Sequence, residues 1–433
     1  MSGDQDPAHA SLQRPLLLLR NVGRLAARRT VRASNLARKA LRRRARAAAR
    51  MWRATREAGK NAMVALRNLS RWLWRRLLGL HKPFVRRWRR MERAREQAAW
   101  QRRERKTERG VRRLAASGRP ILLGPWLSEV GFETFYWVPF LRWLKAEHNW
   151  DPQRVVAVSR GGVRSWYSDL AADYVDVFDV MDPPTFARRS QERREAGEGT
   201  HKQLDLAVLD RDILDFARQA TGRADAIVIH PSAMYRLFRA YWLGHRPVNF
   251  VLERVRHIRP APPSTFDLSF LPRRYVAVKA YTAASLPDTP RNRLTLQAIV
   301  EHLADHIDVV TLDTGLAIDD HDDYLLSRHS RVHSLAGLLT PANNLELQTQ
   351  VISRAEAFVG TCGSLTWLAP LLGIPTVALM SDSRFLYPHL YLARQVYLQQ
   401  GAALFATVDV NAAGPLHIGL DRVLDGTHAQ TQT

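Results

Sequence analysis

The chain has 433 residues, enough for two or three domains with a sizeable core. Its single cysteine, Cys362, excludes an internal disulfide framework and a zinc site built from several cysteines. No apolar run reaches the roughly 18 to 20 residues that a membrane-spanning helix needs. The apolar run at 15–20 is too short for a signal peptide, and it follows Asp4 and Asp6 where basic residues belong. We therefore expect a cytoplasmic protein.

The formal net charge of +24 is concentrated in the first quarter of the chain. Residues 1–117 hold 34 of the 65 Lys and Arg residues but only 7 of the 41 Asp and Glu residues. The rest of the chain is nearly balanced and slightly acidic. The basic charge therefore describes an N-terminal extension, and the body of the protein lacks the charge of a nucleic-acid binder.

Ala, Leu and Arg dominate the extension and favour a helix. The segment 71–90 interleaves tryptophans with arginines, which suits an anionic membrane surface on the inner face of a bacterial plasma membrane. Three alternatives stay open. The extension could bind nucleic acid or a partner protein, it could be a solvated helical or disordered segment, or translation could begin at Met51, Met63 or Met91.

From residue 118 onward, strand-like apolar runs alternate with helical patterns. The first set lies at 120–124, 154–159, 174–180 and 225–230, and the second at 275–280, 307–313, 331–335, 357–361 and 376–380. The Pro-rich stretch 259–274 separates the two sets and is a natural linker. Strands that alternate with helices predict parallel sheets. We therefore predict an α/β fold of two facing Rossmann-like domains, 118–258 and 275–425, followed by a tail, 426–433.

In open parallel sheets, ligands bind beyond the carboxyl ends of the strands, so the loops there are the candidate sites. The first such loop follows strand 120–124 and carries Glu129 and Glu133, with Gly131 between them. A carboxylate above a sheet edge is well placed to act as a general base. The alternative is a carboxylate that only complements a helix dipole.

The second loop is the small-residue turn Gly-Thr-Cys-Gly-Ser, 360–364, between a strand and an apolar segment that we expect to be a helix. Backbone N–H groups at a helix start form an anion site suited to a diphosphate. The alternative is that packing alone requires the glycines. The position of the turn in the second α/β half favours the ligand-binding interpretation.

Together the two loops resemble GT-B glycosyltransferases, most closely the heptosyltransferase family of lipopolysaccharide assembly. That family reads V-G-x-D-T-G-x-x-H-L-A-A-x-L-G-x-P-T in its donor domain. Eight residues here fall in register without a gap: Val359, Gly360, Leu368, Ala369, Leu372, Gly373, Pro375 and Thr376. In the first loop Glu133 stands six residues before Pro139, the offset of the family's proposed catalytic Asp. The resemblance covers about 118–425.

The departures from the family pattern concern the donor. Cys362 replaces the family's Asp, Gly363 its Thr, Ser364 its Gly and Trp367 its His, so the donor sugar stays open. The stretches 124–133, 228–238, 279–293 and 360–375 are also similar to GT-B proteins encoded among bacterial capsule and surface-polysaccharide genes.

The resemblance implies a glycosyltransferase without a metal or other cofactor, which takes a nucleotide sugar and a glycan or lipid-linked acceptor. Lys279 ends the first strand of the second half, where its ammonium could reach a diphosphate, and Arg291 follows on the same loop. The family pattern adds Gly360, Thr361, Gly363 and Ser364 as donor-binding residues. Asp288 and Thr289 are assigned to capping a helix at 291–303.

Further candidates come from the first half. Glu133 or Glu129 would take the proton of the acceptor hydroxyl, and His230 is a third catalytic candidate because it ends a strand at the same cleft. Arg160, Gly161 and Arg236 are candidates for acceptor binding. For Lys279 the alternative is a surface lysine, and for His230 a packed loop histidine. The acidic cluster 319–324 is interpreted as a solvated loop and not as a metal site.

Two other functions fit the same features. A nucleotide-sugar epimerase of similar two-domain build would also need the diphosphate turn and the carboxylates. A non-catalytic binding protein on a degenerate transferase scaffold would keep the fold without the chemistry.

Overall fold

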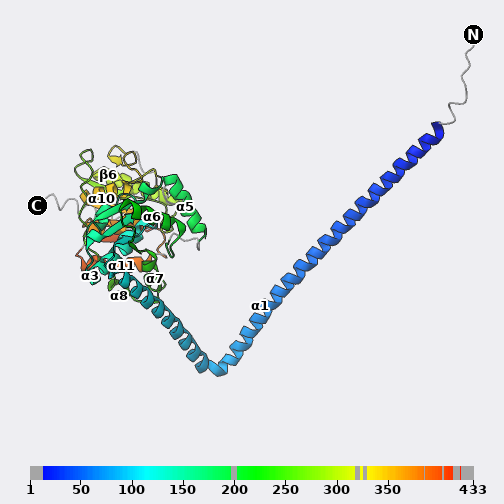
Figure 1. Cartoon of the computed structure of the whole chain (residues 1–433), viewed down its shortest axis with the longest axis horizontal. Helices are drawn as coiled ribbons and strands as arrows, with labels where there is room; N and C mark the ends of the chain where they lie inside the picture. The colour runs from blue at the N-terminus through cyan, green and yellow to red at the C-terminus, as the bar shows by residue number, and fades with distance from the viewer. Residues whose placement is uncertain are drawn as a thin grey trace, which may run out of the picture. The chain divides into compact units, whose positions relative to one another are not determined.

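The computed structural model describes residues 13–196, 202–316, 322–324, 329–384, 386–401, 404–412 and 420. The chain divides into two compact units, Met1–Arg95 and Glu96–Thr433. Helix α1 (Gln13–Ala115) runs through the first unit and contributes its last turns to the second (Figure 1). Of the two predicted states of the extension, helical or disordered, the described part is helical. Within the described residues, no helix is both long enough and apolar enough to cross a membrane.

The last turns of α1 belong to the body of the protein, so the division falls at Arg95 and not at residue 117. Val111 and Ala115 are buried in the hydrophobic core. Glu104 pairs with Arg246, and Glu108 pairs with Arg254 at 3.2 Å. These contacts attach residues 96–115 to the second unit.

The N-terminal lobe is built on a parallel sheet of four strands. These are β1 (Ile121–Leu123), β2 (Val155–Ser159), β3 (Asp173–Asp176) and β4 (Ile227–Ile229), in the order β3-β2-β1-β4. The prediction of a strand over 174–180 is wrong beyond Asp176. The Asp176 carboxylate accepts a hydrogen bond from Phe178 N at 2.9 Å and caps a helix that starts at Val177.

The helices of this lobe follow the strands in alternation. They are α2 (Val130–Phe132), the π-helix η1 (Glu133–Trp137), α3 (Val138–His148), η2 (Pro152–Arg154), η3 (Arg164–Tyr167), α4 (Val177–Val180), α5 (Pro183–Ala196), α6 (Val208–Ala220), α7 (Ser232–Trp242) and α8 (Asn249–Leu252). Because strand side chains alternate between faces, Leu122 and Val156 pack with Ile213 of α6, while Ile121 and Leu123 belong to the cluster on the other face.

The C-terminal lobe is built on a parallel sheet of six strands. These are β5 (Tyr275–Lys279), β6 (Asp308–Thr311), β7 (Val332–Ser334), β8 (Ala357–Thr361), β9 (Thr376–Met380) and β10 (Phe405–Asp409), in the order β10-β9-β8-β5-β6-β7. The sequence did not predict β10. The other elements are α9 (Pro290–His306), α10 (Asn344–Arg354), η4 (Ser364–Trp367), η5 (Ala369–Leu372) and α11 (Tyr387–Gln399).

The helix expected after the Gly-Thr-Cys-Gly-Ser turn does not form as an α-helix. The segment makes two 3₁₀ turns, η4 and η5, and ends at Gly373 with φ 85°. Pro370 lies inside the segment and lacks the N–H that a continuous α-helix would require there. The cap of α9 is confirmed for Thr289, which accepts a hydrogen bond from Asn292 N at 3.1 Å.

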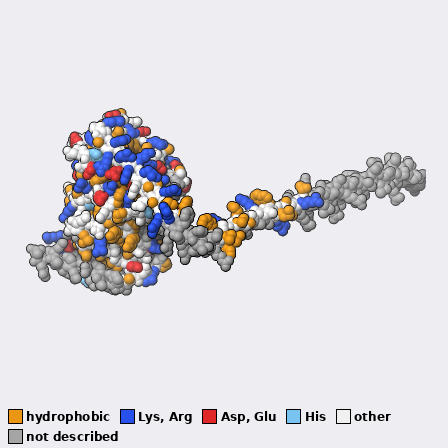
Figure 2. Space-filling view, turned by 90° about the horizontal axis from the view of Figure 1, so that it is seen from below, with side chains coloured by type: hydrophobic (Ala, Val, Ile, Leu, Met, Phe, Trp, Pro, Cys, Tyr) orange, Lys and Arg blue, Asp and Glu red, His pale blue; other side chains and the backbone are white. Residues whose placement is uncertain are grey.

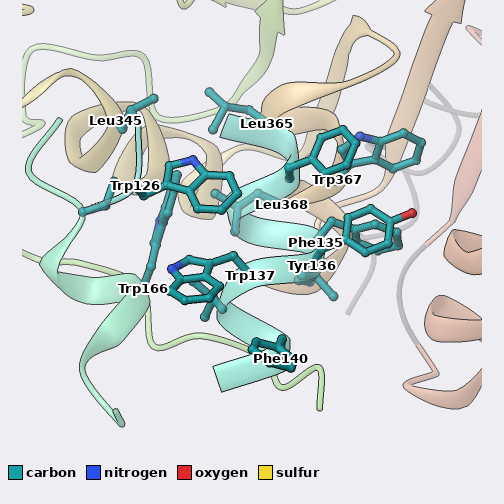
Figure 3. Close-up of a cluster of buried hydrophobic side chains, with 14 of the residues drawn as sticks. Trp126, Phe135, Tyr136, Trp137, Phe140, Trp166, Leu345, Leu365, Trp367 and Leu368 are labelled. Atoms are coloured by element: carbon teal, nitrogen blue, oxygen red, sulfur yellow. The ribbon is translucent and has the colours of Figure 1, made fainter. Parts of the chain in front are cut away.

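The two lobes face one another, as predicted, and share one hydrophobic cluster. Figure 3 shows Trp126, Phe135 and Trp137 of the N-terminal lobe beside Leu365 and Trp367 of the C-terminal lobe. The rings of Phe135 and Trp367 stack with centroids 5.3 Å apart. The predicted α/β architecture with two Rossmann-like lobes is therefore confirmed, and the contact between the lobes is hydrophobic.

Candidate active site between the lobes

A cavity of 440 Å³ lies between the lobes. Its lining comes from the loops that follow β1, β2, β5 and β8, together with residues of α5 and the start of α11. These loops leave the carboxyl ends of both parallel sheets, where ligands of such folds bind. The volume falls in the usual range for a small-molecule site.

The cavity is strongly basic. Arg160, Arg193, Arg194 and Lys202 line it, and Glu129 is the one acidic side chain in the described lining. Burial lowers the pKa of Lys202, while the nearby Glu129 carboxylate opposes that shift. The Lys202 ammonium also lies 5.3 Å from the ring centroid of Phe132. A site with this charge favours a ligand with several negative charges.

Arg160 is the most confined of these cations. It follows the last residue of β2, is 6% exposed, and donates from a terminal nitrogen to Ser128 O at 2.8 Å. Its Nε has no hydrogen-bond partner among the described residues. A buried guanidinium with an unused donor is costly unless something accepts from it. Arg160, which the sequence predicted as an acceptor-binding residue, lines the cavity.

A smaller cavity of 70 Å³ adjoins the first and shares four lining residues with it: Val130, Arg160, Tyr281 and Ser364. Lys279 lines only this smaller cavity, and its ammonium is 2.6 Å from Asp323 Oδ1 and 2.8 Å from Leu312 O. The Lys279 charge is thus already paired within the lobe. The prediction that it reaches a diphosphate in the main cavity is not supported by this geometry.

In the Gly-Thr-Cys-Gly-Ser turn, the first two residues pack inside the lobe and the last two line the main cavity. Thr361 is fully buried, and its hydroxyl bonds to the backbone N–H and C=O of Tyr281, each at 2.9 Å. A Cβ on Gly360 would lie 2.6 Å from Lys279 O, so this glycine serves strand packing. Gly363 and Ser364 line the main cavity. Of the four predicted donor residues in this turn, only these two are in a position to contact a ligand.

Glu133 is excluded from the cavity, which corrects its assignment as an acceptor-facing base. It is fully buried, and its Oε1 accepts hydrogen bonds from Ser159 and Tyr167 hydroxyls, both at 2.5 Å. Burial raises its pKa to about 7, against these two hydrogen bonds. Glu133 is a buried core carboxyl of the N-terminal lobe in this structure.

Glu129, the other predicted base, does line the cavity. It stands just before α2 with an extended backbone, φ −63° and ψ 134°, and is half-buried. Its side chain makes no capping hydrogen bond to the helix that follows. Glu129 thus stands at the start of a helix, as the dipole alternative requires, and also lines the cavity, as a general base requires.

Gly161 and Gly162 hold the lobes together and do not contact the main cavity. Gly161 O accepts hydrogen bonds from Leu345 N and Glu346 N, both at 3.1 Å, at the start of α10. A Cβ on Gly162 would lie 2.5 Å from Ala342 O. The prediction that Gly161 binds an acceptor is wrong in this structure, because the C-terminal lobe occupies the space beside it.

The remaining candidates lie elsewhere. His230 and Arg236 line a separate groove against helix α1, and Arg291 is exposed at the start of α9, 3.4 Å from Asn411 O. None of these three lines either cavity between the lobes. Part of the acidic cluster 319–324 lies outside the described residues. In the described ranges, no three His, Cys, Asp or Glu side chains gather as metal ligands.

Sequence reasoning missed several lining residues. Arg193, Arg194 and Lys202 come from α5 and the segment after it, where no motif distinguishes them from other arginines and lysines. His389 was also missed, and its Nδ1 lies 2.7 Å from the Tyr136 hydroxyl. Burial and the Lys202 charge lower the pKa of His389 to about 3. The only sequence feature that could have indicated these residues is the high arginine content of 183–196, which is equally typical of a solvent-exposed helix.

No protein-family model and no curated protein sequence matches the chain. Among solved structures, the chain is similar to the ADP-heptose lipopolysaccharide heptosyltransferase II of E. coli, at 15% identity and TM-score 0.39, over 72% of this chain and 99% of that one. It is also similar to a family 9 glycosyl transferase from Veillonella parvula, at 9% identity and TM-score 0.38, over 70% and 97%.

A third similar structure is the UDP-GlcNAc 2-epimerase of Methanocaldococcus jannaschii, at 12% identity and TM-score 0.32, over 70% of this chain and 92% of that one. Heptosyltransferases are thus among the structural neighbours, as the sequence motifs predicted. With TM-scores of 0.39 or less, these likenesses assign neither an activity nor a ligand to this chain.

Proposed function

We propose that the chain transfers a glycosyl unit from a nucleotide sugar to an acceptor hydroxyl in the cavity between the lobes. The observation that carries the proposal is the convergence of Arg160, Arg193, Arg194 and Lys202 on one cavity at the carboxyl ends of both sheets. When a glycosyl bond to a nucleotide breaks, negative charge grows on the leaving diphosphate. Fixed cations stabilise that charge without reorganising during the reaction.

Arg160 and the turn at Gly363 meet the diphosphate from opposite lobes in this proposal. The Nε–H of Arg160 is available as a donor. The backbone N–H groups of Gly363 and Ser364 donate to no other group in the described part of the chain. Charge-assisted hydrogen bonds from such donors are the stronger kind.

Glu129 is the proposed general base, since it is the one carboxylate in the described lining of the cavity. A base near the acceptor hydroxyl removes its proton as the new bond forms. We expect Glu129→Gln to lower the rate roughly 100- to 10,000-fold while nucleotide binding is retained. Glu133→Gln is the matched control, because that carboxyl is buried away from the cavity and should leave the rate within a few-fold.

The measurement is the release of nucleotide from UDP, GDP, ADP and CMP sugars, with water or added glycans as acceptor. Equal rates in wild type and Glu129→Gln would contradict the assignment of the base. A nucleotide-sugar epimerase would use the same cavity but would convert a single sugar nucleotide to its epimer and release no nucleotide. A non-catalytic binding protein would bind nucleotides and do neither.

We further propose that the acceptor is a surface glycan or a lipid-linked sugar, and that helix α1 brings the enzyme to an anionic membrane surface. Trp52, Met63 and Leu66 are exposed, and at 100° per residue they fall on one face of α1. Figure 2 shows hydrophobic and basic side chains intermixed along the described part of this helix. Lys60 and Arg67 fall on the adjacent face. An apolar stripe beside a basic one is typical of helices that lie in a membrane interface.

Replacing Trp72, Trp74 and Trp88 by Ser in the full-length chain tests the role of α1. All three are at least half exposed, so the substitutions should leave folding intact. We expect weaker sedimentation with vesicles of phosphatidylcholine and phosphatidylglycerol. Unchanged binding would count against the membrane role and leave the transferase proposal intact.

A further inference from the structure

A second cavity, of 550 Å³, lies outside the site between the lobes. One wall is the end of helix α1 with Arg103 and Lys106, and the other is helix α7 with Arg236 and Arg239. Both walls belong to the compact unit Glu96–Thr433. We call this cavity the basic groove. Each wall presents two cations three residues apart, which places them on one face of their helix.

Three of the four cations of the basic groove have no anionic partner among the described residues. Arg103, Lys106 and Arg239 form no ion pair within the described residues, whereas Arg236 pairs with Asp205 outside the lining. No acidic side chain belongs to the described lining. Like charges held across a groove repel one another, and an anionic ligand would remove that repulsion.

His230 also lines the basic groove. It is 9% exposed, and its Nδ1 accepts a hydrogen bond from Ser232 N at 3.2 Å, which leaves the ring proton on Nε2. Nε2 makes no hydrogen bond, although Asp210 Oδ1 lies 3.4 Å away. Because Asp210 is fully buried, Nε2 points to an interior carboxylate, and His230 contributes part of the groove wall but no free donor.

The floor of the basic groove is aliphatic. Val111 and Leu114 of α1 contribute to it, with Val228 and Ala233 of the N-terminal lobe. Trp100 is the one Trp, Tyr or Phe in the described lining, and Arg103 already lies 5.8 Å from its ring centroid. Aliphatic side chains suit a hydrocarbon chain and give nucleobases nothing on which to stack.

We propose that the basic groove binds one anionic phospholipid, with the phosphate between the two pairs of cations and an acyl chain along the aliphatic floor. Basic pockets that recognise anionic headgroups have this combination of clustered Lys and Arg with apolar surface. Residues 51–74 of helix α1 also expose apolar and basic side chains, a composition that suits an anionic membrane surface. The proposal does not depend on the transferase proposal, since no residue lines both cavities.

The test uses the full-length chain and dihexanoyl phosphatidic acid below its micelle concentration, with binding measured by titration calorimetry. Dihexanoyl phosphatidylcholine and inorganic phosphate are the comparison ligands. The variant Arg103→Ala/Lys106→Ala removes two groove cations. The matched control Arg105→Ala/Arg109→Ala removes two exposed cations from the same turns of α1 that do not line the groove.

We expect the wild type and the control to bind phosphatidic acid equally. Each surface cation contributes roughly a fivefold factor to the binding of an anionic lipid, so the groove variant should bind roughly 25-fold more weakly. Phosphatidylcholine and inorganic phosphate should bind far more weakly than phosphatidic acid. Equal losses in both variants, absent binding, equal binding of inorganic phosphate, or displacement of the lipid by a short single-stranded DNA would each overturn the proposal.

Discussion

Each lobe has a glycine-containing loop at the edge that faces the other lobe. The glycines of the two loops have different neighbours. In the N-terminal lobe, Gly161 and Gly162 lie against the start of α10, where side chains would collide with the other lobe. In the C-terminal lobe, Gly363 lines the main cavity, where only the Tyr281 hydroxyl lies near its missing Cβ. A glycine at a strand end therefore marks a close approach, and the approaching group is protein in one loop and, in our proposal, a ligand in the other.

The largest effect on stability should come from Gly162→Ala. Its φ of +77° is unfavourable for alanine, and the new Cβ would meet the backbone carbonyl of Ala342, which cannot swing away. We expect a loss of about 4 kcal/mol in the free energy of unfolding in urea. Gly222→Ala is the control, because its φ is +65° but nothing lies within 4 Å of its Cβ. A loss of about 1 kcal/mol is expected there, and equal losses would refute the docking role.

The second prediction concerns the buried Glu133, whose pKa rises from 4.5 to about 7 on folding. The folded state then binds a proton that the unfolded state has lost, so this group's contribution to stability is complete below pH 4.5. It is lost as the pH rises through about 7 and amounts to about 3 kcal/mol. Asp176, with its pKa raised to about 6, adds a similar trend at lower pH.

Glu133→Gln isolates the Glu133 contribution. The difference in unfolding free energy between wild type and this variant should become less favourable to wild type between pH 4.5 and pH 8. A difference that stays constant over that window would show that the carboxyl is not held in the buried, protonated state.

Gly363→Ala should weaken ligand binding, which Gly162→Ala should leave intact, and its φ of +145° means that it should lower stability as well. The added Cβ would lie 2.7 Å from the Tyr281 hydroxyl, at the wall of the main cavity. We expect nucleoside diphosphate affinity to fall roughly tenfold, about 1.4 kcal/mol, by titration calorimetry. Gly162→Ala, examined while still folded, should keep its affinity. Lost affinity in Gly162→Ala with retained affinity in Gly363→Ala would contradict the assignment of the two loops.

The smallest effect should come from a single hydrogen bond between the lobes. Trp166 Nε1 donates to Thr349 Oγ1 at 3.1 Å, and both residues are buried. Thr349→Val keeps the shape but leaves the indole N–H without an acceptor. A loss of about 1 kcal/mol in unfolding free energy is expected, and a stabilised variant would show that the bond does not hold the lobes together.

The sequence was sufficient for the parts of the fold that depend on periodicity. Apolar runs such as 275–280 and 376–380 became strands, because parallel strands buried on both faces are continuously apolar. The sequence was misleading at Asp176, where a capping side chain ended a strand early, and after Cys362, where Pro370 broke an expected helix. β10 went unpredicted because only one of its five residues, Val408, is buried and it pairs with β9 alone.

The candidate site was less predictable than the fold. Glu129, Arg160, Gly363 and Ser364 were found because they follow strands. A position after a strand also led to the prediction of Glu133 and Lys279. The Glu133 side chain is buried in the core, and the Lys279 ammonium forms an ion pair with Asp323. The sequence shows that a residue follows a strand and therefore lies near the carboxyl edge of the sheet. Which way its side chain points depends on contacts with residues far away in the chain.

The central claim is that the cavity between the lobes holds a diphosphate against Arg160. Titration calorimetry of the full-length chain with ADP, UDP, GDP and CDP tests it directly. Arg160→Gln should weaken binding of the preferred nucleotide roughly 10- to 100-fold, because it removes a buried charge-assisted donor. Arg188→Gln, an exposed arginine on α5 outside the cavity, should bind as wild type. Binding of no nucleoside diphosphate, or equal binding by both variants, would contradict the account.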